Sequence, residues 1–188
     1  MKLKTCLTAI VVTTLLLSIA ACSSDESPAS KSDSETDGAE TPERATDFEL
    51  VLFGNDDHEA GEIIRLSQFQ GSPVVLNFWF PSCPPCVAEM PDFETAYQKF
   101  KEDGVEFIGV QLVGLDSVED GQKFVNKLGV NYSLGPDKLG DKMGGIVMDY
   151  KISGFPTTVL IDKDGNIRRR WSGALDLEKL EELIRDIM

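Results

Sequence analysis

The sequence predicts an α/β domain: a mixed central sheet with helices on both faces. Two observations support this fold class. Residues 73–80, "PVVLNFWF", form a continuous apolar run, as expected of a strand that is covered on both faces. Segments with strand and helix periodicity then alternate along the chain, and a predicted hairpin and helix end it. This order is typical of a layered α/β architecture.

The first half of the domain begins with two predicted strands, residues 47–53 and 62–66, around a polar turn. After the apolar run of residues 73–80, large side chains recur at helical spacing: Met90, Phe93, Tyr97 and Phe100. They predict a helix that ends near Lys101. Pro91 lies inside this helix and should kink it, because proline offers no N–H to the preceding turn.

The middle of the domain continues with a second central strand, residues 105–112. A helix follows, which begins at a cap formed by Asp116 or Ser117 and ends near Gly129. A short strand is expected near residues 132–134. A short helix is expected around residues 146–150.

The last part of the domain predicts a β-hairpin, residues 157–162 and 166–171, joined by the turn "DKDG". Asp176 caps a final helix. Its apolar side chains recur on one face: Leu180, Leu183, Ile184 and Ile187. The strand–helix units therefore come first, and the hairpin and final helix complete the mixed sheet.

The first residues have the layout of an export signal. Lys2 and Lys4 give a positive start, and residues 7–19 form an apolar core that is shorter than the ~18 residues of a spanning helix. The ending "SIAAC" resembles a bacterial lipobox, which implies cleavage after residue 21 and lipidation of Cys22. An uncleaved membrane anchor and a plain cleaved signal are the alternatives. We therefore expect the protein outside the cytoplasm, lipid-anchored to the bacterial cell membrane.

Residues 22–47 predict an acidic tether. Residues 23–47 contain eight acidic residues, two basic residues and no large apolar residue, so they cannot bury enough surface to fold. An acidic recognition tail is the alternative. The folded domain is then expected over residues 48–188, which carry 14 basic and 24 acidic residues. Only residues 168–170 concentrate basic charge, and they lie on a predicted strand, which argues against nucleic acid as a partner.

The cysteines define the candidate chemistry. Cys6 lies in the signal and Cys22 is the lipidation candidate, so only Cys83 and Cys86 belong to the folded domain. With one histidine in the chain, His58, the domain lacks the paired ligands of a structural zinc site. Covalent haem attachment would need a histidine directly after Cys86, where the chain has Val87.

A purely structural disulfide between Cys83 and Cys86 would close a very small loop and contribute little stability. The pair instead falls where a central strand ends and a helix begins. There the helix N–H groups and dipole stabilise a Cys83 thiolate. Cys86, one turn later, would face inward within reach of the first sulfur. This arrangement predicts dithiol–disulfide exchange.

Three segments together carry a resemblance to a known family: "VVLNFW" (74–79), "CPPCVAEMP" (83–91) and "GFPTTVLIDKDGNI" (154–167). The chain resembles the TlpA/ResA-like membrane-anchored thioredoxins over residues 47–188. The resemblance implies a thioredoxin-like fold with an extra N-terminal β-hairpin and a central insert after residue 112. It implies no cofactor beyond a redox-active Cys83–Cys86 disulfide, and no metal.

The resemblance also implies roles for individual residues. Phe155–Pro156 matches the family's cis-proline position, where the backbone of the preceding residue pairs with the client chain. Glu89 matches the glutamate that carries the proton of the resolving thiol, since Asn77 cannot accept it. The alternative for Glu89 is a first-turn acid that favours the helix dipole. These matches make Glu89 and Pro156 candidate catalytic residues beside the two cysteines.

The rim of the site departs from the family. Ser82 stands where the family often has tryptophan, which puts substrate preference in doubt. Pro84 and Pro85 have no N–H to offer a sulfur, which favours a reductant over a strong oxidant. We expect client contacts from Ser82, Pro84, Pro85 and Phe155.

The expected function is therefore an extracytoplasmic thiol-disulfide oxidoreductase that reduces disulfides in exported proteins. The family's clients include apocytochrome c and surface enzymes such as methionine sulfoxide reductase. A membrane electron-donor protein is the implied second partner. The alternatives are a thiol oxidase that installs disulfides and a non-catalytic lipoprotein binding module. A peroxidase is weaker still, because the Pro-x-x-x-Thr-x-x-Cys pattern is absent from the sequence.

Overall fold

The computed structural model describes residues 42–139, 142–143 and 145–188. The predicted signal peptide (1–21), the lipidation candidate Cys22 and most of the tether lie outside the described residues. Among the helices of the described part, none combines the length and apolar character needed to cross a membrane.

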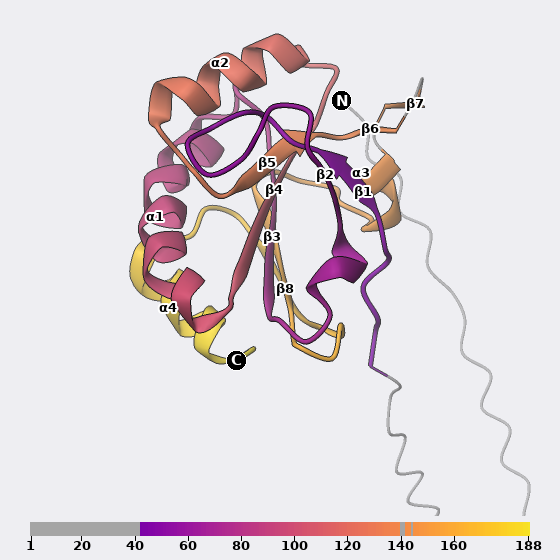
Figure 1. Ribbon diagram of the computed structural model, residues 1–188, viewed down its shortest axis with the longest axis vertical. Coiled ribbons are helices and arrows are strands. Elements are labelled where there is room, and N and C mark those ends of the chain that lie inside the picture. Colours follow the sequence, from indigo (N-terminus) through magenta and orange to yellow (C-terminus); the bar gives the residue numbers. More distant parts are fainter. Residues whose placement is uncertain (1–41, 140–141, 144) are drawn as a thin grey trace, which may run out of the picture. The chain divides into compact units, whose positions relative to one another are not determined.

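The central sheet has five strands in the order β5-β4-β3-β8-β9 (Figure 1). Their bounds are β3 Val74–Trp79, β4 Glu106–Gln111, β5 Ser133–Pro136, β8 Thr157–Ile161 and β9 Ile167–Ser172. β3 and β4 pair in parallel, as do β4 and β5, whereas β8 pairs antiparallel with both β3 and β9. The predicted mixed sheet is confirmed. β3, the continuous apolar run, is buried along its whole length.

The predicted N-terminal hairpin is also present. β1 (Glu49–Val51) and β2 (Ile63–Arg65) pair antiparallel, and the 3-10 helix η1 (Leu66–Phe69) follows. The hairpin attaches to the edge of the central sheet, where the N–H of Phe53 donates to the carbonyl of Leu134 at 2.7 Å. A second small pair, β6 (Lys138–Leu139) and β7 (Lys142–Met143), follows β5.

The helices begin and end close to the predicted residues. They are α1 Pro84–Phe100, α2 Val118–Leu128, α3 Gly145–Asp149 and α4 Leu177–Arg185, with the 3-10 helix η2 at Lys101–Asp103. Ser117 caps α2, and Gly129 ends it with a φ of 65°. Asp176 caps α4 by accepting the N–H of Lys179, as predicted. α1 continues through Pro91 as one helix.

The two faces of the sheet are covered differently. On the first face, α1, α2 and α4 pack over alternate residues of β3, including Val75 and Trp79. On the second face, the short α3, η1 and the N-terminal hairpin cover Leu76 and Phe78. Figure 1 shows α1 and α4 on one side of the strands and α3 with the hairpin on the other. The predicted helices on both faces are confirmed, and the long ones gather on one face.

The described end of the predicted tether is bound to the domain. The N–H of Ala45 donates to the carbonyl of Gly165 at 3.0 Å, and the Tyr150 hydroxyl donates to the carbonyl of Thr46 at 2.8 Å. Arg170 and Glu43 form an ion pair at 2.9 Å. The structured part of the chain therefore begins several residues before Phe48, because backbone and polar groups hold a segment that has no large apolar side chain.

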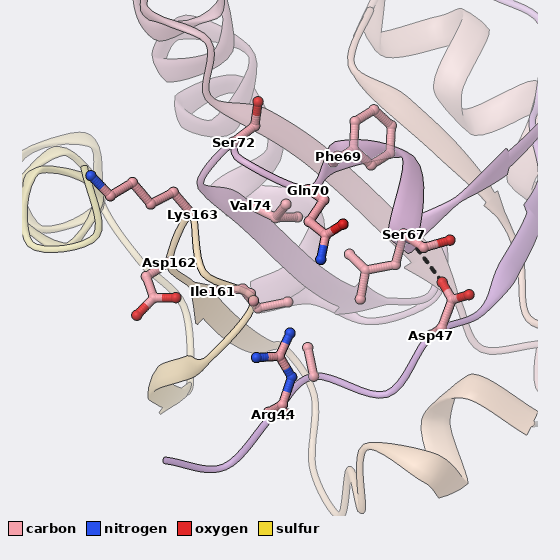
Figure 2. A pocket seen from close by; sticks show the side chains of 13 residues that line it. Arg44, Asp47, Ser67, Phe69, Gln70, Ser72, Val74, Ile161, Asp162 and Lys163 are labelled. Atoms are coloured by element: carbon pink, nitrogen blue, oxygen red, sulfur yellow. Dashed lines mark hydrogen bonds between the residues drawn. The ribbon is translucent and has the colours of Figure 1, made fainter.

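This segment also forms one wall of a cavity of about 160 Å³ at the end of the sheet where β3 begins (Figure 2). Val74 and Ile161, neighbours in the β3–β8 register, lie at its base. Arg44 and Lys163 border it. The cavity contains none of the candidate site residues, since Cys83 follows the opposite end of β3.

Candidate active site

The two cysteines lie where β3 gives way to α1. Cys83 is the N-cap of α1, and its sulfur is bonded to that of Cys86 in a disulfide. The Sγ atom of Cys83 also accepts the N–H of Cys86 at 3.3 Å. The predicted cap position of the first cysteine and the inward position of the second are both confirmed.

Both cysteines of the disulfide are buried. Cys86 is 0% exposed and Cys83 only 4%. In the disulfide form the first cysteine therefore lies just beneath the surface. Ser82, Pro84 and Pro85 are exposed around it. An incoming chain would reach the pair from this rim, and Cys83 is the member of the pair with accessible surface.

The start of α1 supplies few N–H donors to the sulfur. Pro84 and Pro85 occupy the first two helical positions and have no N–H. The third position, Cys86, provides the N–H that reaches Cys83 Sγ. A helix start normally presents several free N–H groups to an anion, so this one has fewer N–H donors to offer a Cys83 thiolate.

Glu89 lies one turn after Cys86 and is almost completely buried, with 2% of its surface exposed. Its Oε1 accepts the amide N–H of Asn77 Nδ2 at 2.8 Å, and its Oε2 accepts the backbone N–H of Leu175 at 2.9 Å. Asn77 Nδ2 also donates to Thr158 Oγ1 at 3.2 Å. The carboxylate therefore joins α1 to β3 and to the loop before α4.

The pKa of Glu89 rises from 4.5 to about 7. Burial raises it because the charged form loses water, while the N–H donors of Leu175 and Asn77 oppose that rise. A carboxyl group with a pKa near neutrality can accept a proton and return it at physiological pH. Cys86 and Glu89 are three residues apart in α1, so their side chains share one face of the helix.

The turn before β8 has the expected conformation: the Phe155–Pro156 peptide bond is cis. The ring of Phe155 packs edge-on against Phe80, with their centroids 5.4 Å apart. Phe80 belongs to the segment between β3 and Cys83, and its carbonyl accepts the N–H of Cys83 at 3.1 Å. The structure therefore places the proline turn beside the segment that carries the disulfide.

Ser82 is held by Asp116, which the sequence predicts only as a possible helix cap. Asp116 Oδ2 accepts both the N–H of Ser82 at 3.0 Å and its hydroxyl at 2.7 Å. Of the two residues predicted to cap α2, Asp116 or Ser117, Ser117 is the N-cap. The neighbouring Leu115 is 70% exposed. The loop before α2 thus forms a further part of the rim.

His58, which the sequence analysis placed in a polar turn, is half-buried. Its Nε2 lies 3.2 Å from Ser133 Oγ, and its Nδ1 lies 3.7 Å from Glu62 Oε2. Within the described ranges, no three His, Cys, Asp or Glu side chains gather as a metal site.

Sequence reasoning missed three members of the site: Asp116, Thr158 and Leu175. Thr158 follows the cis-proline turn and pairs with Asn77 in the register of β3 and β8, so strand pairing was the signal that could have found it. Leu175 contributes only its backbone N–H, which no side-chain pattern reveals. The contact between Asp116 and Ser82 joins two loops 34 residues apart.

Fold and site together define a class: thioredoxin-like proteins with a cysteine pair at the start of a helix, a buried carboxyl group and a cis-proline turn. Solved structures similar to this chain include the following two. StoA from Bacillus subtilis is 25% identical with a TM-score of 0.62, covering 73% of this chain and 96% of that one. A secreted Mycobacterium tuberculosis disulfide oxidoreductase homologous to E. coli DsbE is 25% identical with a TM-score of 0.62, covering 74% and 95%.

The sequence comparisons define the family. A model of the AhpC/TSA family matches residues 41–170. The thiol-disulfide oxidoreductase ResA of Oceanobacillus iheyensis is 37% identical over 144 residues, which cover 76% of this chain and 70% of that protein. The chain belongs to the AhpC/TSA family and is a ResA-like thiol-disulfide oxidoreductase.

Proposed function

We propose that this enzyme works as a reductant of disulfides in exported proteins, with Cys83 as nucleophile, Cys86 as resolving thiol and Glu89 as proton carrier. The observation that carries the direction is the pair of prolines at the start of α1. Because Pro84 and Pro85 remove two N–H donors, the Cys83 thiolate is weakly stabilised. A weakly stabilised reduced form favours the disulfide, and a couple that favours its disulfide is a reductant.

The exchange begins when the Cys83 thiolate attacks one sulfur of a client disulfide. A mixed disulfide forms, and the other client sulfur leaves as a thiolate that takes a proton from solvent. Cys86 then loses its proton to Glu89, and its sulfur attacks Cys83 Sγ. The second client sulfur leaves and is protonated in turn. The client gains two electrons, and the protein ends as the Cys83–Cys86 disulfide.

The exposed rim is the proposed contact surface for the client. Ser82, Pro84 and Pro85 border Cys83, and Phe155 adjoins Phe80 from the cis-proline turn. In this proposal the backbone of Phe155 pairs with an extended client segment, and Pro156 holds that backbone in place. No metal or organic cofactor takes part, since the cysteine pair carries both electrons.

The reduction potential of the Cys83–Cys86 couple tests the direction. Equilibration with glutathione should give a potential more negative than about −200 mV, on the reducing side of oxidising folding enzymes. Pro85→Ala returns one N–H beside Cys83 and should raise the potential, with about 30 mV for each tenfold change in the exchange constant. Pro91→Ala, which adds an N–H away from the sulfur, is the matched control. A wild-type potential near −120 mV would favour the thiol oxidase.

The proposed location is the outer face of the bacterial cell membrane, with Cys22 lipidated and the acidic segment as tether. The export-signal layout of residues 1–22 supports it, and one similar structure is a secreted disulfide oxidoreductase. Labelling cells with a fatty-acid analogue should mark the wild type and leave Cys22→Ala unmarked. An unlabelled wild-type protein in the soluble fraction would contradict this location.

The clients can be captured on Cys83, and a second partner must supply the electrons. A reductase outside the cytoplasm must receive electrons, so we propose a membrane protein that reduces the Cys83–Cys86 disulfide. The Cys86→Ala variant cannot resolve mixed disulfides and should accumulate clients, such as apocytochrome c or a methionine sulfoxide reductase, on Cys83. The double variant Cys83→Ala/Cys86→Ala is the control, and proteins trapped equally by both would not be clients.

A further inference from the structure

Tyr132 carries a buried hydroxyl that the proposed reaction has not used. The residue is 1% exposed, and its Oη has no hydrogen-bond partner among the described residues. A buried hydroxyl without a partner is costly, and such groups in a native protein call for an explanation. The position of the ring suggests one.

The ring of Tyr132 lies over the strand next to β5, on the side nearer the site. Tyr132 directly precedes β5, the neighbour of β4. A Cβ atom placed on Gly109 of β4 would lie 3.1 Å from Tyr132 Cε2. The end of the ring that bears the hydroxyl therefore lies over Gly109. Gly109 belongs to β4, whereas the backbone of Tyr132 is next to β5, so the side chain reaches over the neighbouring strand. Glycine at this position leaves room for the ring.

Gly109 is in turn the neighbour of Asn77 in the register of β3 and β4. Asn77 Nδ2 donates to Glu89 Oε1 at 2.8 Å. Because neighbouring strands lie about 4.8 Å apart, the tip of Tyr132 and the Glu89 carboxylate stand over adjacent positions on the same face of the sheet. The end of the ring that bears the hydroxyl and the proton carrier therefore lie over neighbouring strands on one face of the sheet.

Burial raises the pKa of Tyr132 well above its ordinary value, and two nearby carboxylates of α1, Glu89 and Glu94, raise it further. Glu94 already has polar partners, because it accepts the N–H of Asn131 at 2.7 Å and the amide of Gln98 at 2.8 Å. Glu89 accepts one N–H on each oxygen and retains lone pairs. Around Glu89, Asn77 and Thr158 are uncharged, and Cys86 is the other group that titrates once the disulfide is reduced.

We propose that Tyr132 is a positioning residue for proton transfer: its hydroxyl donates to the charged Glu89 carboxylate, directly or through one water, while that carboxylate accepts the Cys86 proton. This inference rests on the proposed function of Glu89. The proton of Cys86 moves to Glu89, the Cys86 sulfur attacks Cys83, and the client thiolate leaves. Tyr132 keeps its own proton throughout, because burial holds its pKa well above the ordinary value.

The pH dependence of mixed-disulfide resolution tests the inference. Tyr132→Phe keeps the ring but removes a donor that stabilises the charged carboxylate, so the pKa of Glu89 should move upward by about one unit. Resolution near pH 7 should then slow about fivefold and recover at higher pH. Tyr150→Phe is the matched control, since the Tyr150 hydroxyl donates to the carbonyl of Thr46 on the other face of the sheet. A Tyr132→Phe profile that coincides with the wild type would overturn the proposal.

A second measurement needs neither a client nor a folded Tyr132 variant. The chain has three tyrosines, so the ζ-carbon NMR signals of Tyr97 and Tyr150 can be assigned with their phenylalanine variants, which leaves Tyr132. The Tyr132 signal of the reduced protein should titrate with the midpoint of Glu89, and this titration should vanish in Glu89→Gln. A Tyr132 signal that ignores Glu89 would reject the contact. Loss of client reduction by the wild type would instead reject the proposed function.

Discussion

The two faces of the central sheet differ in whether every buried polar side-chain atom has a partner. Under α3, the Tyr150 hydroxyl donates to Thr46, and Asp137 accepts the N–H groups of Ile146 and Val147 at 3.0 and 2.9 Å. Beneath α1 and α2 lie the three buried side-chain atoms that lack a partner among the described residues: Trp79 Nε1, Gln111 Oε1 and Tyr132 Oη.

The same α1 face holds the disulfide and the buried Glu89. Unpaired buried polar atoms cost stability, so natural proteins retain few of them. All three of the unpaired atoms lie on the α1 face, and none lies on the α3 face of the described residues. The α1 face combines packing with polar groups that the exchange reaction is proposed to use.

The largest expected effect is on activity, and it compares a cysteine of the α1 face with a core residue of the α3 face. Cys83→Ala should abolish disulfide reduction in an insulin assay, because the thiolate is the nucleophile. Ile108→Val, a core substitution on the α3 face, should cost about 1 kcal/mol of stability and leave the rate unchanged. Equal activity in wild type and Cys83→Ala would remove the functional difference between the faces.

The second effect concerns the buried carboxyl group. The pKa of Glu89 is raised in the folded protein from 4.5 to about 7, so the folded state binds its proton more tightly than the unfolded state. This contribution to stability is complete below about pH 4.5 and is lost as the pH rises through 7. The free energy of unfolding should fall by about 3 kcal/mol across that window.

Glu89→Gln should lack this pH-dependent loss, and it should also slow resolution of the mixed disulfide near neutral pH. Urea unfolding at about pH 5 and about pH 8 measures the first effect. Parallel stability curves for the two proteins would show that Glu89 has an ordinary pKa. An unchanged pH–rate profile in the variant would reject its role as proton carrier.

A third, smaller effect tests the close packing over β4. A Cβ at Gly109 would lie 2.7 Å from Leu134 Cδ2 as well as 3.1 Å from the Tyr132 ring. Gly109→Ala should therefore destabilise the protein by about 1–3 kcal/mol. Gly154→Ala, where no atom lies within 4 Å of the added carbon, is the control. Thermal unfolding compares them, and equal midpoints would mean that the Tyr132 ring is not confined over Gly109.

The smallest effect compares a paired hydroxyl with an unpaired one. Tyr150→Phe removes a hydrogen bond to Thr46 and should cost about 1 kcal/mol in the oxidised protein. Tyr132→Phe removes a hydroxyl without a partner, so it should be neutral or slightly stabilising in the same form. If Tyr132→Phe were the more destabilising variant in urea unfolding, the contrast between the two faces would be wrong.

Local sequence patterns were enough to predict most of the elements. The apolar run of β3, the helical spacing in α1 and the caps at Ser117 and Asp176 each depend on neighbours within a few residues. The position of Cys83 as N-cap follows from the same local logic. The tether is predicted to end at residue 47, because the segment lacks large apolar side chains. In the structure, backbone and polar groups near its end nevertheless bind the domain.

The sequence by itself determined the fold class, the place of the cysteine pair and the absence of N–H donors at Pro84 and Pro85. These features follow from residue type and short-range spacing. The tertiary structure decided which distant groups surround Glu89: Asn77 from β3, the N–H of Leu175 and the ring of Tyr132 over Gly109. Burial and hydrogen bonds across strands set the pKa of a carboxyl group, and neither is encoded in any short stretch of residues.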